Sequence, residues 1–305
     1  MSLISKFLLF FILLSGIFAC ETYVEIEVPP IEKKPVLTCL FTKNQPFKLR
    51  LTMSANVNDT SIVFIKNATV KLFADGKFIE HLQEQDSGFY LSSHLVEPKI
   101  LYSVEADVDG FPIIKASDSL PELIKAEQVY FKLNAIYDYG NQFAKANILF
   151  SDPPGNNYYE LALYAKYTYY NDWDGTYREG RINDNIAYWL IDDPTLEVED
   201  ITGWIGSVSF NDELFNGKKY QLQIPVEKLP ANAKHYVRFN SVSYHYYKYK
   251  SVLDKHLFNQ GGWSYDGLLL ITGGNPLEMY SNVENAYGIF AGYVSQEIEV
   301  TDIRE

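Results

Sequence analysis

Residues 101–108 read LYSVEADV, and the side chains of this stretch decide the fold class. Its apolar residues Tyr102, Val104 and Ala106 occupy every second position, with Ser, Glu or Asp between them. Successive side chains of an extended strand point to opposite faces, so this period of two predicts a strand with one buried face. Asp109-Gly110 follows at once and is typical of a tight hairpin turn. The stretch therefore predicts an antiparallel sheet with one face packed on a core.

The same pattern extends over the first third of the chain. Residues 48–53, KLRLTM, also alternate, and Asp75-Gly76 marks a second tight turn. Segments of this kind, about seven between residues 35 and 117, are typical of a small sandwich of antiparallel strands. The pattern predicts an immunoglobulin-like β-sandwich over residues 35–121.

Residues 122–305 are expected to form a larger antiparallel β domain with one helix. Strand patterns occur at 129–135, 145–150, 158–170, 219–225, 235–241 and 289–300, whereas 171–205 is irregular and is expected to form loops. Ser243 can cap a helix, because Tyr246, Tyr249 and Leu253 follow at spacings of three and four, and Gly261-Gly262 is expected to end it. The expected fold class is therefore mostly β.

The N-terminus has the features of a targeting segment. Lys6 precedes an apolar run at residues 7–14, and Ala19 stands directly before Cys20. This order predicts a signal peptide over residues 1–19, and its ending resembles the bacterial lipobox, in which the cysteine is lipidated. An ordinary secretory signal that ends at a cysteine is the alternative. The apolar run is too short to cross a bilayer as a helix.

Residues 20–34 are expected to form a lipidated tether. Glu21, Glu25 and Glu27 follow Cys20 and are similar to a surface-export signal, although a generic acidic tether is the alternative. Pro29-Pro30 stiffens the tether into an extended form. The other cysteine, Cys39, lies in an apolar run and is expected to be a buried hydrophobic residue without a disulfide partner.

Charge and composition exclude some classes of function. The 305-residue chain has a formal net charge of −13, which repels phosphate backbones and anionic lipids, so nucleic acid is not an expected partner. Its 15% aromatic content is too high for a disordered chain.

Motifs for catalysis or metal binding are weak. The five histidines have no zinc-type spacing, and the sequence contains no nucleophile elbow, phosphate-binding glycine loop or His-Glu-x-x-His motif. Asp172-Trp173-Asp174-Gly175 resembles the start of a calcium loop, but a later glutamate is missing, so a solvated acidic turn is favoured. Neither a catalytic residue, a metal nor a cofactor is expected.

Aromatic residues are concentrated between residues 158 and 189. Strand alternation places about half of them on each face, so a core cannot easily absorb them all. Tyr and Trp are enriched at interfaces, although a Tyr-rich core with its hydroxyls at the rim is an equal alternative. The candidate interface or ligand residues are Tyr167, Tyr169, Tyr170, Trp173, Trp189 and Trp204.

Several short motifs, in order, resemble a known family. NPLEMYSNV at 275–283, YGIFAGY at 287–293 and NATVKLF at 67–73 are similar to the Bacteroidota surface lipoprotein family named domain of unknown function 4249. The sequence departs from the family pattern at Lys99 and at Asn285-Ala286, where glycine is usual and turns are expected.

The resemblance implies a lipid-anchored protein of the outer membrane that faces the cell exterior. It also implies a non-enzymatic accessory subunit of an outer-membrane β-barrel complex, either a TonB-dependent receptor or the barrel-assembly and lipoprotein-export machinery. The alternative is a module that captures glycan or another nutrient at the cell surface, and a hydrolase is a third possibility. The family carries no established catalytic residues that could be transferred.

Overall fold

The structure is a computed structural model. It describes residues 32–56, 59, 61–171, 173, 175–183, 186–187, 190–196, 204–205, 207–226, 233–259 and 277–305. The signal peptide, Cys20 and most of the tether lie outside the described residues.

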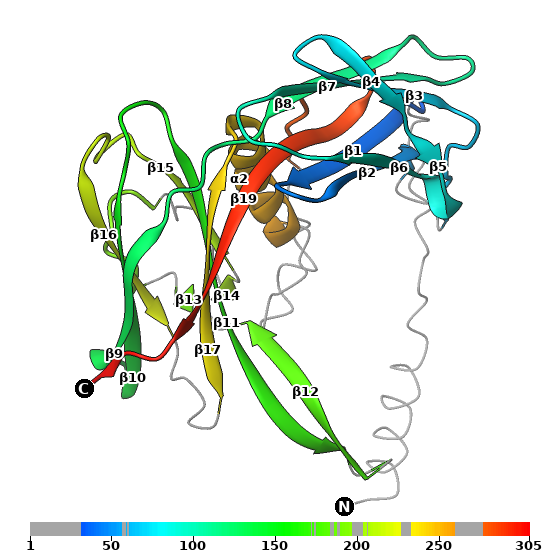
Figure 1. Cartoon of the computed structure of the whole chain (residues 1–305). Coiled ribbons are helices and arrows are strands. Elements are labelled where there is room, and N and C mark those ends of the chain that lie inside the picture. The colour runs from blue at the N-terminus through cyan, green and yellow to red at the C-terminus, as the bar shows by residue number, and fades with distance from the viewer. Residues whose placement is uncertain are drawn as a thin grey trace, which may run out of the picture.

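The described chain forms three sheets and one α-helix (Figure 1). The nine-stranded sheet contains β12 (Thr176–Asn183), β11 (Tyr158–Asn171), β17 (Lys234–Val242), β19 (Tyr287–Val300), β1 (Pro35–Thr42), β2 (Pro46–Met53), β6 (Phe89–Leu95) and β5 (Gln83–Glu84) in spatial order, with β15 (Ser207–Asn211) also paired to β11. The six-stranded sheet contains β14 (Trp204–Ile205), β13 (Ile186–Ala187), β16 (Lys219–Val226), β10 (Asn141–Ser151), β9 (Ala126–Asp138) and β20 (Ile303–Arg304). The five-stranded sheet contains β18 (Val283–Glu284), β8 (Ile114–Ser119), β7 (Leu101–Asp107), β3 (Thr69–Ala74) and β4 (Lys77–His81).

The first core lies between the five-stranded sheet and the β1-β2-β6 part of the nine-stranded sheet. Its buried residues include Leu37, Leu49, Tyr102 and Val104, so the period-two pattern of the sequence is confirmed. Asp75 and Gly76 both have positive φ between β3 and β4, as the expected tight turn requires. Cys39 is also buried in this core, and burial raises the pKa of its thiol to about 12.

The second core lies between the six-stranded sheet and the β11-β17 part of the nine-stranded sheet. Phe150 of β10 contacts Tyr159 of β11 at 5.2 Å and Phe239 of β17 at 4.9 Å between ring centroids. All three rings are fully buried. Part of the aromatic content therefore belongs to a Tyr-rich core.

Strand β19 joins the two sandwiches. It pairs antiparallel with β17 over its second half and parallel with β1 over its first half. Figure 1 shows it as the long red-orange strand that runs from the upper sandwich to the lower left. The sheet of the N-terminal sandwich thus contains a strand from the C-terminal end of the chain.

Helix α2 (Tyr244–Asn259) lies against β19, β11 and β15. The Ser243 hydroxyl accepts a hydrogen bond from the Tyr246 N–H at 3.1 Å, so the predicted cap is confirmed. Gly261-Gly262, expected to end the helix, lies outside the described residues. No described helix is long and apolar enough to span a membrane.

The mostly β fold with one helix is confirmed, but the prediction of loops over 171–205 was wrong in part. β12 is a strand of eight residues, and β13 and β14 are short strands in the same interval. The residues of β12, TYREGRIN, do not alternate between apolar and polar, which is why the pattern missed it.

Lys99 and Asn285, the two departures from the family pattern, adopt φ values of 66° and 61°. These values lie in the left-handed region that glycine occupies without strain. Both positions therefore adopt the backbone conformation typical of glycine, although neither is a glycine.

Candidate functional site

Strands β11 and β12 form a two-stranded ribbon that continues beyond the rest of the sheet. β17 pairs with β11 only as far as Lys166↔Lys234, and β15 ends its pairing at Ala162. From Tyr167↔Gly180 to Asn171↔Thr176, β12 is the only described strand that pairs with β11. Figure 1 shows the ribbon as the long green hairpin at the lower right. An isolated two-stranded hairpin is marginally stable in water, so this segment is a candidate for contact with a partner.

Tyrosine side chains lie on both faces of this ribbon. Tyr167 and Tyr169 share one face, and their ring centroids are 5.9 Å apart. Tyr170 and Tyr177 lie on the other face as a cross-strand pair with an edge-to-face contact at 5.2 Å. All four rings are partly or largely exposed. The arrangement gives an amphipathic surface of rings and hydroxyl groups, which suits an interface.

The base of the ribbon is fixed by stacked cations and rings. The guanidinium of Arg181 lies 3.6 Å from the ring centroid of Tyr164, which stacks on Tyr236 of β17 at 5.2 Å. Burial and the nearby Glu297 carboxylate raise the pKa of Tyr164 to about 12, so the phenol stays neutral at physiological pH. The Lys166 ammonium donates to Glu297 at 3.3 Å. These contacts tie the ribbon to β17 and β19 and set its direction.

The structure brings together four of the six candidate residues. Tyr167, Tyr169 and Tyr170 lie on the ribbon, and Trp173 lies in its turn. Trp189 lies outside the described residues. The backbone of Trp204 belongs to β14 in the six-stranded sheet, so it does not lie on the ribbon. Asp172 and Asp174, the possible calcium ligands, lie outside the described residues, and no cluster of acidic, His or Cys side chains suited to a metal occurs among the others.

Comparison with known protein families identifies the family to which the chain belongs. Residues 21–299 match the model described as "Domain of unknown function (DUF4249)". The chain belongs to the DUF4249 family. No curated protein matches this DUF4249 chain. A crystal structure of a tyrosine-to-glycine mutant of Salmonella alpha-2-macroglobulin is similar, with 10% sequence identity and a TM-score of 0.26. The match covers 91% of this chain and 15% of that chain. A similarity at this level supports no conclusion about the fold or the function of this chain.

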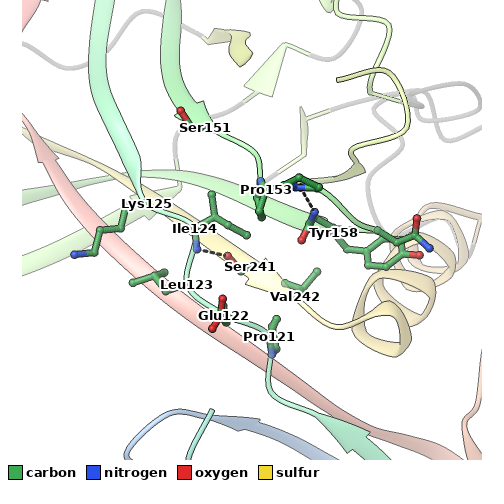
Figure 2. A pocket seen from close by; sticks show the side chains of 13 residues that line it. Pro121, Glu122, Leu123, Ile124, Lys125, Ser151, Pro153, Tyr158, Ser241 and Val242 are labelled. Carbon is green, nitrogen blue, oxygen red and sulfur yellow. Dashed lines mark hydrogen bonds between the residues drawn. The ribbon is translucent and has the colours of Figure 1, made fainter. Parts of the chain in front are cut away.

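The DUF4249 chain also has a groove of about 570 Å³ where the segment that connects the two sandwiches passes the second one (Figure 2). It lies between the connecting segment 121–125, the turn at 151–158 and the end of β17. The Ile124 N–H donates to the Ser241 hydroxyl at 2.9 Å, which uses the hydroxyl to hold the connecting segment. Glu122 and Lys125 are the only charged side chains of its lining, and they form no catalytic pair. The ribbon is therefore the stronger candidate site.

Sequence reasoning missed Arg181, Gly180 and the second exposed hairpin turn at Tyr137 and Tyr139. Arg181 and Gly180 gain their roles from Tyr164 and Tyr167 on the neighbouring strand, and the pairing register was not available from the sequence. The sequence Tyr139-Gly140 between two strand patterns was a usable signal for the second turn.

Proposed function

We propose that this DUF4249 chain is a lipid-anchored surface protein that acts as a non-enzymatic accessory subunit of an outer-membrane β-barrel protein. The observation that carries the proposal is the β11–β12 ribbon, which leaves the sheet after Lys166 and presents Tyr167, Tyr169 and Tyr170 on its two faces. A protein partner that packs against these faces would supply the burial that a two-stranded ribbon lacks.

The chemistry of the ribbon suits a protein partner. A stable protein interface buries about 1,200–2,000 Å² and depends on a few Tyr, Trp or Arg side chains. The ribbon combines Tyr rings with Arg178 and Glu179, so it offers both apolar area and charged groups at its rim. The ion pair between Lys166 and Glu297 helps to hold the ribbon in one orientation relative to the sheet. A ribbon that is already ordered loses less conformational entropy when it binds.

The N-terminal sequence supports a partner in the same membrane. If Cys20 carries lipid, the 14-residue segment 21–34 reaches at most about 45 Å when extended. The body then stays near the membrane plane, where the external loops of a β-barrel stand. Because both proteins share one membrane, a high effective concentration makes even a weak interface sufficient.

A glycan-capture module is the second candidate, and the pair of Tyr167 and Tyr169 favours it. Their ring centroids lie 5.9 Å apart on one partly exposed face, where a sugar ring could stack. The same residues would serve either function, so the experiment below separates the two.

The test is recovery of partners from outer membranes dissolved in mild detergent. A Tyr167→Ser, Tyr169→Ser, Tyr170→Ser variant is compared with wild type and with a Leu95→Ser, Leu101→Ser control, which removes two exposed side chains from the first sandwich. We expect a β-barrel protein to be recovered with wild type and control, and to be lost with the triple variant. Absence of a barrel in every preparation, together with glycan binding by the wild type that the triple variant lacks, would replace the proposal with the capture module.

A further inference from the structure

The four most exposed large apolar side chains of the described residues lie in or directly beside two hairpin turns. Trp173 is 98% exposed, Tyr139 97%, Tyr177 77% and Tyr137 72%, and the next is Ile62 at 61%. Trp173 and Tyr177 lie at the turn of the β11–β12 ribbon, and Tyr137 and Tyr139 lie at the turn between β9 and β10. The most exposed large side chains of the described residues are therefore concentrated at these two turns.

These two turns lie at the same end of the second sandwich. One belongs to the nine-stranded sheet and the other to the six-stranded sheet. β19 runs in the direction of β11, and β20, which follows β19, pairs parallel with β9, so β9 and β11 both run toward this end. Figure 1 shows both hairpins ending at the lower side of the molecule. Both turns therefore point in the same direction.

Tyr139 adopts a conformation that the fold itself does not need. Its φ is 43°, in the left-handed region, and Gly140 follows with a φ of 85°. Asn or Gly fits this turn position without strain, whereas a tyrosine does not. Because the ring of Tyr139 is almost fully in solvent, no packing offsets the strain. A bulky aromatic residue in this strained position, with no packing to offset the strain, supports a role in binding.

The side-chain chemistry selects the kind of partner. The two turns carry Tyr and Trp, which combine an apolar ring with a polar group, whereas exposed aliphatic residues such as Ile62, Leu95 and Leu101 lie in the first sandwich. Tyr and Trp are the residues enriched at the water interface of membranes. Asp138 lies beside one turn, and the sequence places Asp172 and Asp174 beside Trp173, against Arg178 next to Tyr177, so the excess of carboxylates disfavours an anionic surface.

We propose that Tyr137, Tyr139, Trp173 and Tyr177 form a two-point contact with the interfacial layer of a zwitterionic lipid bilayer. The inference rests on the proposed function, because the expected lipid anchor holds the body close to a membrane. The tether joins β1 at Pro35, beside the start of β19 and away from the turns, so the contact requires the body to lie along the membrane surface and not to stand upright on it. The turns place their rings at the headgroup level, and the faces of the ribbon remain available for the barrel. Binding by the turns alone is weak, and the anchor raises their effective concentration at the bilayer.

The test uses the mature chain with Cys20→Ser, so that no acyl chain contributes, and vesicles of phosphatidylcholine. Binding is measured by co-sedimentation for this chain and for a Tyr137→Ser, Tyr139→Ser, Trp173→Ser, Tyr177→Ser variant. We expect the variant to lose binding by on the order of tenfold or more, since each buried aromatic ring contributes strongly to transfer from water. An Ile62→Ser, Leu101→Ser variant is the matched control and should bind like the parent chain. Equal binding by parent and turn variant, or no binding by the parent, would overturn the inference.

Two further measurements separate insertion from a loss of folding. Tyr139→Asn suits the turn conformation, so it should raise or preserve the melting temperature while weakening vesicle binding. Bromine-labelled lipid should quench tryptophan fluorescence in the parent chain, and Trp173→Phe should remove most of that quenching. If Tyr139→Asn binds as well as the parent, or if quenching survives Trp173→Phe unchanged, the turns are not the contact.

The result is independent of the partner-recovery experiment. That experiment is done in detergent, where no bilayer is present, and its variant changes Tyr167, Tyr169 and Tyr170 instead. Loss of vesicle binding in the turn variant with continued recovery of the barrel supports the lipid contact. Recovery of the barrel with wild type, its loss with the turn variant, and no vesicle binding by the parent would assign the turns to the barrel and overturn the lipid contact.

Discussion

The phenol ring of Tyr167 lies directly over Gly180 on the neighbouring strand of the ribbon. A Cβ atom added at Gly180 would come within 2.6 Å of Tyr167 Cζ, so the ring occupies the space that any other residue would need. The two residues are direct cross-strand partners. Gly180 thereby sets the orientation of the first tyrosine of the proposed interface.

Gly180→Ala should displace the Tyr167 ring and weaken recovery of the barrel partner several-fold, with little change in the melting temperature. The ribbon lies outside both buried cores, so its distortion leaves the cores intact. The measurement is co-purification beside thermal unfolding. Thr168→Ala, which changes an exposed residue of the same ribbon, is the control. Unchanged recovery with Gly180→Ala would show that the orientation of Tyr167 does not matter for binding.

Gly288→Ala should destabilise the protein severely, by more than about 3 kcal/mol, because the added Cβ would overlap the Leu37 carbonyl oxygen. Gly288 pairs with Leu37 where β19 enters the sheet of the first sandwich, and its φ is 122°. Gly140→Ala is the matched control: its φ is 85° but nothing lies within 4 Å of the added Cβ. The control should cost only about 1 kcal/mol of conformational strain, and chemical denaturation compares the two. Similar losses for both variants would contradict the steric account.

Lys99→Gly should raise the melting temperature by a few degrees. Lys99 has a φ of 66°, and glycine adopts this conformation without the clash of a Cβ atom. The variant also removes an ion pair with Glu122, but both side chains are well exposed, so this loss is small. Lys99→Ala, which removes the ion pair and keeps the Cβ, is the control and should not raise the melting temperature.

Glu80→Gln should weaken the dependence of the free energy of unfolding on pH in acid. The carboxylate of Glu80 on β4 accepts hydrogen bonds from the Ser92 hydroxyl at 2.7 Å and the His94 N–H at 2.9 Å, and also from Ser93, so it links the two sheets of the first sandwich. Partial burial acts to raise the pKa of Glu80, but these hydrogen bonds outweigh it and lower the pKa below its ordinary value of 4.5. A lowered pKa in the folded state contributes stability above pH 4.5 that is lost as the pH falls through the folded value.

In the Glu80→Gln variant this acid-dependent part should disappear, and the free energy of unfolding at neutral pH should fall by about 1–3 kcal/mol. Urea unfolding at a series of pH values below and above 4.5 measures both effects. An equally steep acid dependence in the variant would assign the effect to other carboxylates.

Cys20→Ser should release the protein from the membrane fraction, because the expected lipid is attached to this thiol. The measurement is fractionation of washed outer membranes with detection of the protein in the soluble and membrane fractions. Cys39→Ser is the control for removal of a thiol, and its buried position predicts a loss of stability without loss of membrane attachment. Retention of Cys20→Ser at the wild-type level would mean that another feature anchors the chain.

The local sequence was sufficient for the strands that bury one face. Val104 and Leu49 lie in period-two patterns, and each is fully or almost fully buried as predicted. The helix cap at Ser243 and the turn at Asp75-Gly76 were also predicted correctly from the sequence, because each depends on the chemistry of adjacent residues. β12 was missed, since Arg181 and Gly180 are complementary to Tyr164 and Tyr167 and not to their own neighbours in sequence.

The mostly β fold, the helix and the residues of the aromatic surface could be predicted from local patterns, because side-chain periodicity and turn chemistry act over a few residues. The placement of β19 in the first sandwich beside β1 could not be predicted in this way, because it pairs residues as far apart in the sequence as Val36 and Tyr287. The same holds for the position of the turns at Tyr139 and Trp173 at one end of the second sandwich, which follows from the directions of β9 and β11 in two different sheets. Long-range strand order depends on the summed packing of both cores, and no local pattern encodes that sum.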